Sequence, residues 1–170
     1  FTRSVYLFMQ LMMRGSPRES LLAEYSSKLT PNQRNALVIL IGAVDNNRSR
    51  QLCNSVFYQS RELIYIDSGN GLSSGQVVCG IRRNNRTVQK PVARFYPDIL
   101  EPTDKFPSEL SCAEASVSAP QAITANIMAA TLVLCMLYNI LAAGELVTRM
   151  TTFSSRTVNV RPLLSGRRAA

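Results

Sequence analysis

The chain has 170 residues, the size of one domain, and its balance of 46% hydrophobic and 18% charged residues excludes a disordered tail. It contains no histidine, which excludes His-based triads, and its four cysteines form no CxxC pair, so we predict no zinc site. The formal net charge of +8 suits an acidic partner or a nucleotide. Part of the excess lies in residues 161–170, which we interpret as a basic tail rather than a specific nucleic-acid site.

The chain opens with a segment, residues 1–35, for which we predict helical structure. Ser16-Pro17-Arg18-Glu19 combines a capping serine, a proline at the first helical position and an acid in the first turn. The start has no small-residue cleavage pattern, which argues against a signal peptide. Scattered cysteines indicate reduced thiols, so we expect a cytoplasmic protein.

A strand–helix–strand unit is predicted next. Residues 36–44 form a continuous apolar run of the length of a strand buried on both faces. Residues 45–47 (Asp-Asn-Asn) favour a helix start, and residues 48–58 carry apolar side chains at helical spacing. Residues 63–66 form a second short strand. This order predicts two parallel strands.

A glycine-rich stretch, residues 67–75, follows the second strand. It lacks the GKS or GKT of a Walker loop, so a hairpin turn is the better interpretation. Residues 76–81 would then form a third, antiparallel strand. Residues 82–118 contain four prolines, and we predict a long irregular loop of functional or mobile character.

The next segment, residues 115–144, contains no charged residue. Its length allows a transmembrane helix, but Pro120, interior polar residues such as Asn126 and Asn139, and the absence of a flanking basic cluster argue against one. We therefore predict a long buried helix over residues 119–143 that ends at Gly144. Residues 149–160 are rich in threonine and valine and predict one last strand.

Asp45 is the first candidate site residue. It follows a predicted parallel strand, and ligands of open α/β sheets bind at that edge. A carboxylate there suits Mg²⁺ on a nucleotide, with Asn46, Arg48 and Arg50 beside it to contact phosphate. The competing interpretation is that Asp45 only caps the helix, and spacing alone favours it.

Cys112 is the second candidate, because a cysteine near a helix N-terminus gains thiolate character. The alternative is a cysteine buried under the loop. Cys53 and Cys135 fall on apolar helix faces and Cys79 in a strand, so we predict that these three belong to the core.

Four segments in this order resemble the ThiF-type adenylyltransferases, the superfamily that includes ubiquitin-activating enzymes. Asp45-Asn46 with Arg50 resembles their DNxxxR segment, and residues 66–69 with 75–78 are similar to the next strand–turn–strand. Residues 111–115 (SCAEA) look like the CAEAG segment of bacterial members, with serine in place of the glycine. Residues 120–126 resemble the start of the helix that follows. The likeness covers about residues 36–160.

The resemblance implies a Rossmann-like α/β domain with a mixed sheet, which adenylates the C-terminus of a ubiquitin-like or sulfur-carrier protein with ATP and Mg²⁺. By match, Asp45 would be the Mg-ATP aspartate and Arg50 a supporting or nucleotide-contacting arginine. Cys112 matches a cysteine whose catalytic duty varies among members. The proline-rich stretch would be the crossover loop over the carrier tail.

The sequence departs from the family in two respects. The glycine-rich phosphate loop, with its arginine and lysine, has no match in residues 1–35, and the paired CxxC zinc ligands are absent. We therefore expect a partial domain, inactive alone, that acts as a homo-oligomer or with a partner chain supplying the missing half. A non-catalytic module for dimerisation or carrier docking is the alternative, and a membrane protein is a weaker one.

Overall fold

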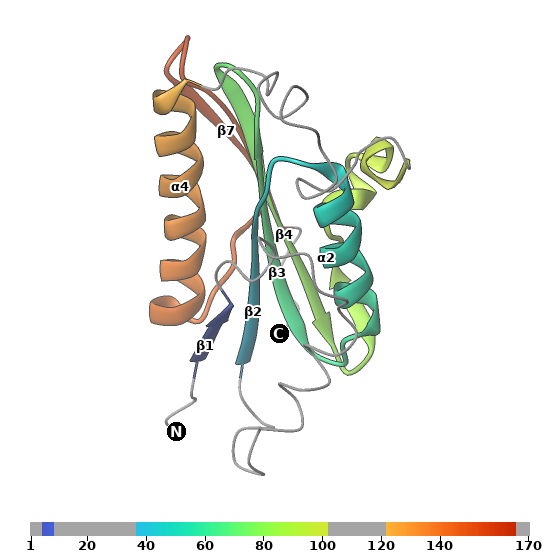
Figure 1. Cartoon of the computed structure of the whole chain (residues 1–170). Helices are drawn as coiled ribbons and strands as arrows, with labels where there is room; N and C mark the ends of the chain where they lie inside the picture. Colours follow the sequence, from blue (N-terminus) through green and yellow to red (C-terminus); the bar gives the residue numbers. More distant parts are fainter. Residues whose placement is uncertain (1–4, 9–36, 102–121, 166–170) are drawn as a thin grey trace.

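The computed structural model describes residues 5–8, 37–101 and 122–165, and it shows an α/β fold with one mixed sheet between two helical layers (Figure 1). The strands lie in the order β1-β2-β3-β4-β6-β7, and β5 pairs with part of β4. Their bounds are β1 Val5–Phe8, β2 Leu37–Ala43, β3 Leu63–Asn70, β4 Ser74–Arg83, β5 Arg86–Gln89, β6 Thr148–Ser154 and β7 Asn159–Leu164. The parallel pairs β1–β2 and β2–β3 meet an antiparallel set from β3 to β7.

The apolar run of β2 is continuous because both of its faces are covered. Val38 and Leu40 pack into the core on the α2 side (α2, Asn47–Gln59), while Ile39 and Ile41 pack on the opposite side. Successive side chains of a strand point to opposite faces, so a strand between two layers needs apolar residues at every position. The predicted strand–helix–strand unit and its parallel pair are confirmed.

The hairpin after β3 is also confirmed, with β3 and β4 antiparallel. The glycine-rich stretch is shorter as a loop than predicted, because the strands extend to Asn70 and resume at Ser74. The prediction of a helical opening segment is wrong for residues 5–8, which form β1 beside β2. The rest of that segment lies outside the described residues.

The prediction of an irregular stretch from residue 82 is wrong as far as residue 101. Asn84 and Asn85 both have positive φ and form the two-residue turn of a hairpin between β4 and β5. Two short 3₁₀ helices follow, η2 (Val92–Arg94) and η3 (Pro97–Leu100). Both pack beside α2, and Val92 and Ile99 are buried in the same core as Phe57.

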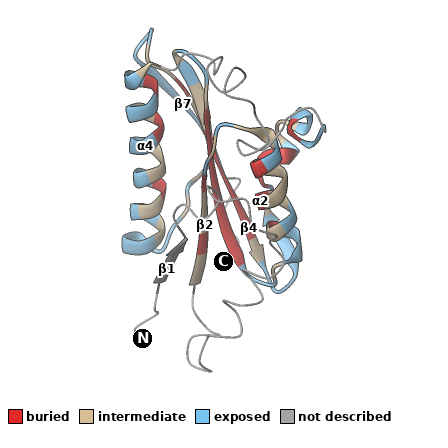
Figure 2. Cartoon of the chain, in the orientation of Figure 1, coloured by how far each residue is buried: buried red, intermediate tan, exposed pale blue. Residues whose placement is uncertain are grey.

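The long apolar helix α4 spans Ile123–Tyr138 and continues as a π-helical turn, η5, over Asn139–Ala143. It ends at Gly144, whose φ of 67° supplies the left-handed stop that was predicted. The prediction that this helix is buried is wrong. Only Ala125, Ala129 and Met136 of α4 are buried, and Figure 2 shows the outer face exposed along its length. One face packs on the sheet, and no described element covers the other.

The helix over Ile123–Ala143 is long and apolar enough to cross a membrane, with 17% of its most apolar window buried. It lies along the sheet instead of standing apart from it (Figure 1). At the C-terminal end, two strands replace the single one predicted, because β6 and β7 form a hairpin. Residues 161–164 of the expected basic tail therefore belong to β7.

Candidate functional site

Asp45 lies two residues beyond the end of β2, at the carboxyl edge of the parallel strands, and it is exposed. Its Oδ1 atom accepts a hydrogen bond from Asn46 Nδ2 at 3.3 Å. The carboxylate thus keeps an oxygen open to solvent at the edge where open α/β sheets bind ligands.

The helix cap is supplied by Asn46 and not by Asp45. Asn46 has extended backbone geometry and its side chain accepts from the Ser49 N–H at 2.8 Å. The capping interpretation of Asp45 therefore assigns the role to the wrong residue, which leaves the Asp45 carboxylate available for another one. Arg48, the second residue of α2, is exposed on the same end of the helix.

Arg50 joins the ends of β2 and β3. Its Nη2 donates to the carbonyl oxygens of Val44 and Ser68, and its Nε lies 3.4 Å from Asp67 Oδ2. Arg50 thereby holds the chain segment that carries Asp45 against the neighbouring strand. Its side chain is 12% exposed, so it is a structural clamp more than a free phosphate ligand.

The partner of this arginine, Asp67, was not singled out from the sequence, where it reads as part of a turn. It is fully buried in β3 and accepts a hydrogen bond from Tyr65 Oη at 2.7 Å. Its other oxygen, Oδ2, has no hydrogen-bond partner in the described structure, and neither has Arg50 Nε. The two charges face each other without a hydrogen bond between them. The sequence does contain a signal for the Tyr65–Asp67 contact, because residues two apart in an apolar strand lie on the same face.

Burial dominates the electrostatics of this cluster. It raises the pKa of Asp67 above its ordinary value of 3.8, against the opposing charge of Arg50. Burial and the nearby Asp67 raise the pKa of Tyr65 well above 10.0. The same two causes raise the pKa of Cys53 to about 12.

Two glycines make room for the cluster. A Cβ added at Gly42 would lie 2.8 Å from Asp67 Oδ1, and one at Gly69 would lie 3.1 Å from an Arg50 guanidinium nitrogen. Real Cβ atoms do not approach oxygen so closely, so Gly42 in β2 is required by the buried carboxylate in β3.

Cys112 lies outside the described residues, but the two ends of its segment are placed. Gln51 Nε2, near the start of α2, donates to the Ile99 and Glu101 carbonyls at 2.9 Å each. Ala122 donates its N–H to the Leu72 carbonyl in the β3–β4 turn at 3.0 Å. Both attachment points lie at the edge of the sheet that carries Asp45.

The remaining cysteines divide between core and surface. Cys53 and Cys79 are buried, as predicted, and burial also raises the pKa of Cys79. The prediction for Cys135 is wrong: it is exposed on α4, because that helix buries only one face. In the described part of the chain no three His, Cys, Asp or Glu side chains gather as a metal site.

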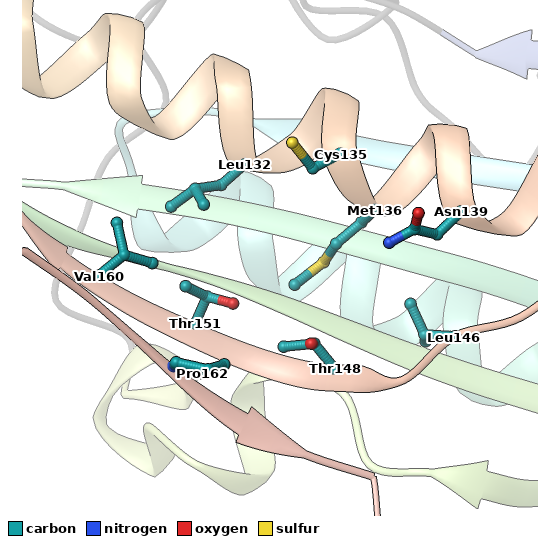
Figure 3. Close-up of a pocket in the computed structure, with 9 residues that line it drawn as sticks. All are labelled: Leu132, Cys135, Met136, Asn139, Leu146, Thr148, Thr151, Val160 and Pro162. Atoms are coloured by element: carbon teal, nitrogen blue, oxygen red, sulfur yellow. The ribbon is translucent and has the colours of Figure 1, made fainter.

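An open cavity of about 200 Å³ lies elsewhere, between α4 and the β6–β7 hairpin (Figure 3). Leu132, Cys135 and Met136 line it from the helix. Thr151 and Val160 are among the residues that face them from the strands. None of the residues predicted as a nucleotide site lines this cavity.

Comparisons with known proteins assign no family to the chain. No protein-family model matches it, and no curated protein matches its sequence. Among solved structures, the crystal structure of selenomethionine PaaA is similar over 88% of this chain, with a TM-score of 0.47 and 14% identical residues. The match covers 46% of the PaaA chain, so this chain spans about half its length.

Proposed function

We propose that this chain is the carboxyl-terminal half of a Rossmann-like, ThiF-type adenylyltransferase domain. Its reaction would be ATP-dependent adenylation of the C-terminus of a ubiquitin-like or sulfur-carrier protein in the cytoplasm. The observation that supports this best is the setting of Asp45. An exposed carboxylate stands at the carboxyl edge of parallel strands, beside the start of α2, and Arg50 anchors its backbone.

The residues at this edge suit Mg²⁺-bound ATP in part. Mg²⁺ on a nucleotide takes one or two protein carboxylates, with phosphates and waters completing its shell. Asp45 would be that carboxylate, while Asn46 and Arg48 at the start of α2 would lie toward the phosphates. In the reaction, the C-terminal carboxylate of the carrier would attack the α-phosphate and pyrophosphate would leave, and Mg²⁺ held by Asp45 would supply charge neutralisation of the triphosphate.

The triphosphate needs more donors than this edge provides. Asn46 already caps α2, and Arg50 is committed to two carbonyls and Asp67. We therefore propose that a partner chain supplies the phosphate loop. The segment of Cys112, attached at Glu101 and Ala122 near the same edge, would cover the tail of the carrier, with Cys112 as the candidate acceptor thiol.

An ATP–pyrophosphate exchange assay tests the proposal. The full chain is combined with candidate carrier proteins and with any chain that supplies a phosphate loop. We expect exchange in one combination and a loss of about 100-fold in Asp45→Ala, the scale typical of removing one group that stabilises developing charge. The control is Asp98→Ala, which removes another exposed aspartate, in η3, and should leave the rate unchanged.

The alternative is a non-catalytic module that docks a carrier protein. Under this alternative no combination supports exchange, and Asp45→Ala still binds the carrier in calorimetry. Exchange that is equally fast in Asp45→Ala and the unmodified chain would contradict the assignment of Asp45, whichever carrier is used.

A further inference from the structure

The outer face of α4 presents large apolar side chains where a surface helix of a soluble protein carries polar ones. Four on α4 (Ile123, Ile127, Leu134 and Tyr138) and Leu141 on the following turn η5 are exposed by 48–74%. Polar residues normally occupy this side of a helix that covers a sheet. A contiguous apolar surface of this kind marks an interaction site.

The spacing of these residues matches a helix that packs on another helix. From Ile123 the exposed apolar positions step by four to Ile127, by three to Ala130 and by four to Leu134. Such alternating steps keep one seam of a helix facing a partner helix. One polar group beside the seam is already bonded, because Thr131 Oγ1 donates to the Ile127 carbonyl at 2.8 Å. Burying Thr131 against a partner would therefore leave its hydroxyl donor paired.

We propose that a second copy of this chain covers this face, with the two α4 helices packed across a two-fold axis. Residues 122–144 carry no charge, so two molecules of net charge +8 can meet here without bringing like charges together. A two-fold interface needs a surface that complements itself, and a regular apolar seam can pack against a second copy of the same seam. This proposal does not depend on the proposed reaction.

The available area is of the right size for a reversible dimer. A fully exposed large side chain presents roughly 150–200 Å², so the five exposed ones offer about 500–600 Å² per copy. The pair would bury about 1,000–1,200 Å², at the lower end of specific interfaces.

A lipid surface fits this face less well. A helix that lies in a membrane interface has lysine or arginine on its polar side, whereas α4 has none and turns its other side to the sheet. To span a bilayer, α4 would have to leave the strands against which Ala125, Ala129 and Met136 are buried.

Sedimentation velocity of the full chain over a range of micromolar concentrations tests the proposal. We expect a monomer–dimer equilibrium whose Kd rises at least tenfold in Leu134→Glu, because a charge in the seam must be desolvated. Val88→Glu, which changes another exposed apolar residue, in β5, should leave the Kd unchanged. If Leu134→Glu does not fold by circular dichroism, the double variant Ile127→Ser/Leu134→Ser takes its place.

A cysteine placed in the seam reports the geometry. In a chain with Cys112→Ser and Cys135→Ser, Ala130→Cys should form a disulfide-linked dimer on mild oxidation, whereas Val88→Cys should not. A chain that stays monomeric at every concentration overturns the proposal. A dimer whose Kd in both seam variants equals that of the unmodified chain overturns it as well. Binding to phosphatidylcholine–phosphatidylserine vesicles that Leu134→Glu abolishes, in a monomer, also overturns it and assigns the face to lipid.

Discussion

Arg50 contacts both strand ends at the candidate site and the buried Asp67. It ties the β2 and β3 ends by two carbonyls and offsets the buried charge of Asp67. The resemblance to ThiF-type enzymes assigned it a supporting or nucleotide-contacting role, and its hydrogen bonds favour the supporting one. Its influence on Asp45 would then pass through the backbone between residues 44 and 50 rather than through a direct contact.

We expect Arg50→Ala to lower the free energy of unfolding by about 3 kcal/mol near neutral pH, because it leaves a buried carboxylate without its cation. Urea unfolding followed by circular dichroism measures this change. Arg94→Ala, which removes an exposed arginine of η2, should change stability by less than about 0.5 kcal/mol. Equal losses in the two variants would mean that the ion pair with Asp67 contributes nothing.

Asp67 should make stability depend on pH. Burial raises its pKa in the folded protein above 3.8, so the folded state binds this proton more tightly than the unfolded chain. The resulting stabilisation is fully present below the unfolded pKa and is lost as pH rises through the folded pKa. The unmodified protein should therefore lose stability relative to Asp67→Asn as pH increases across that window.

Urea titrations of both proteins at a series of pH values from acid to neutral measure the difference directly. A difference that changes in the opposite sense, with the unmodified protein gaining on Asp67→Asn as pH rises, would show that Arg50 outweighs burial. Asp98→Asn provides the control, since the side chain of Asp98 is exposed.

At the scale of elements, the sequence predicted best where hydrophobic pattern and burial coincide. Both faces of β2 are covered, and its sequence is a continuous apolar run. One face of α2 is covered, and its apolar residues recur at helical spacing. The β4–β5 hairpin was missed because its strand is short and exposed, so it has no apolar alternation. Its only signal is Asn84-Asn85, a pair that tolerates the positive φ of a tight turn.

The helix α4 shows why an apolar composition does not predict burial. A run without charge is equally compatible with a core helix, a membrane span and a helix with one face left for a partner. The composition is the same in all three, and only the position of the sheet separates them. Here the sheet covers one face, which is why Cys135 is exposed and Met136 beside it is buried.

The candidate site was predictable only in its exposed half. Asp45 and Asn46 were found because residues that end a strand and begin a helix follow a recognisable order. Asp67 was hidden because a buried charge depends on partners brought by other elements, here Arg50 from α2 and the space above Gly42 in β2. The local pattern places Asp67 and Tyr65 on one face of a strand, but it does not show the contacts with α2 and β2.

At the scale of the whole molecule, the two layers that cover the sheet are unequal. The α2 layer is reinforced by η2 and η3, which add Val92, Ala93 and Ile99 to the core around Phe57. The α4 layer rests on one helix whose buried residues are two alanines and a methionine, and the larger Leu132, Val133 and Leu137 beside them are only partly buried. Small and partly buried side chains bury less apolar area than fully buried large ones, so the α4 layer should open at a lower free energy than the α2 layer.

Two buried thiols report these openings separately, since Cys53 lies in the α2 layer and Cys79 in the α4 layer. With a thiol reagent in weak denaturant, followed by mass spectrometry of peptides, we expect Cys135 to react at once and Cys79 to react before Cys53.

If α4 is also the dimer interface, opening that layer requires dissociation first. Labelling of Cys79 should then slow as protein concentration rises, and Leu134→Glu should remove that dependence. Equal rates for Cys53 and Cys79 under every condition would instead show that both layers open only when the whole fold does.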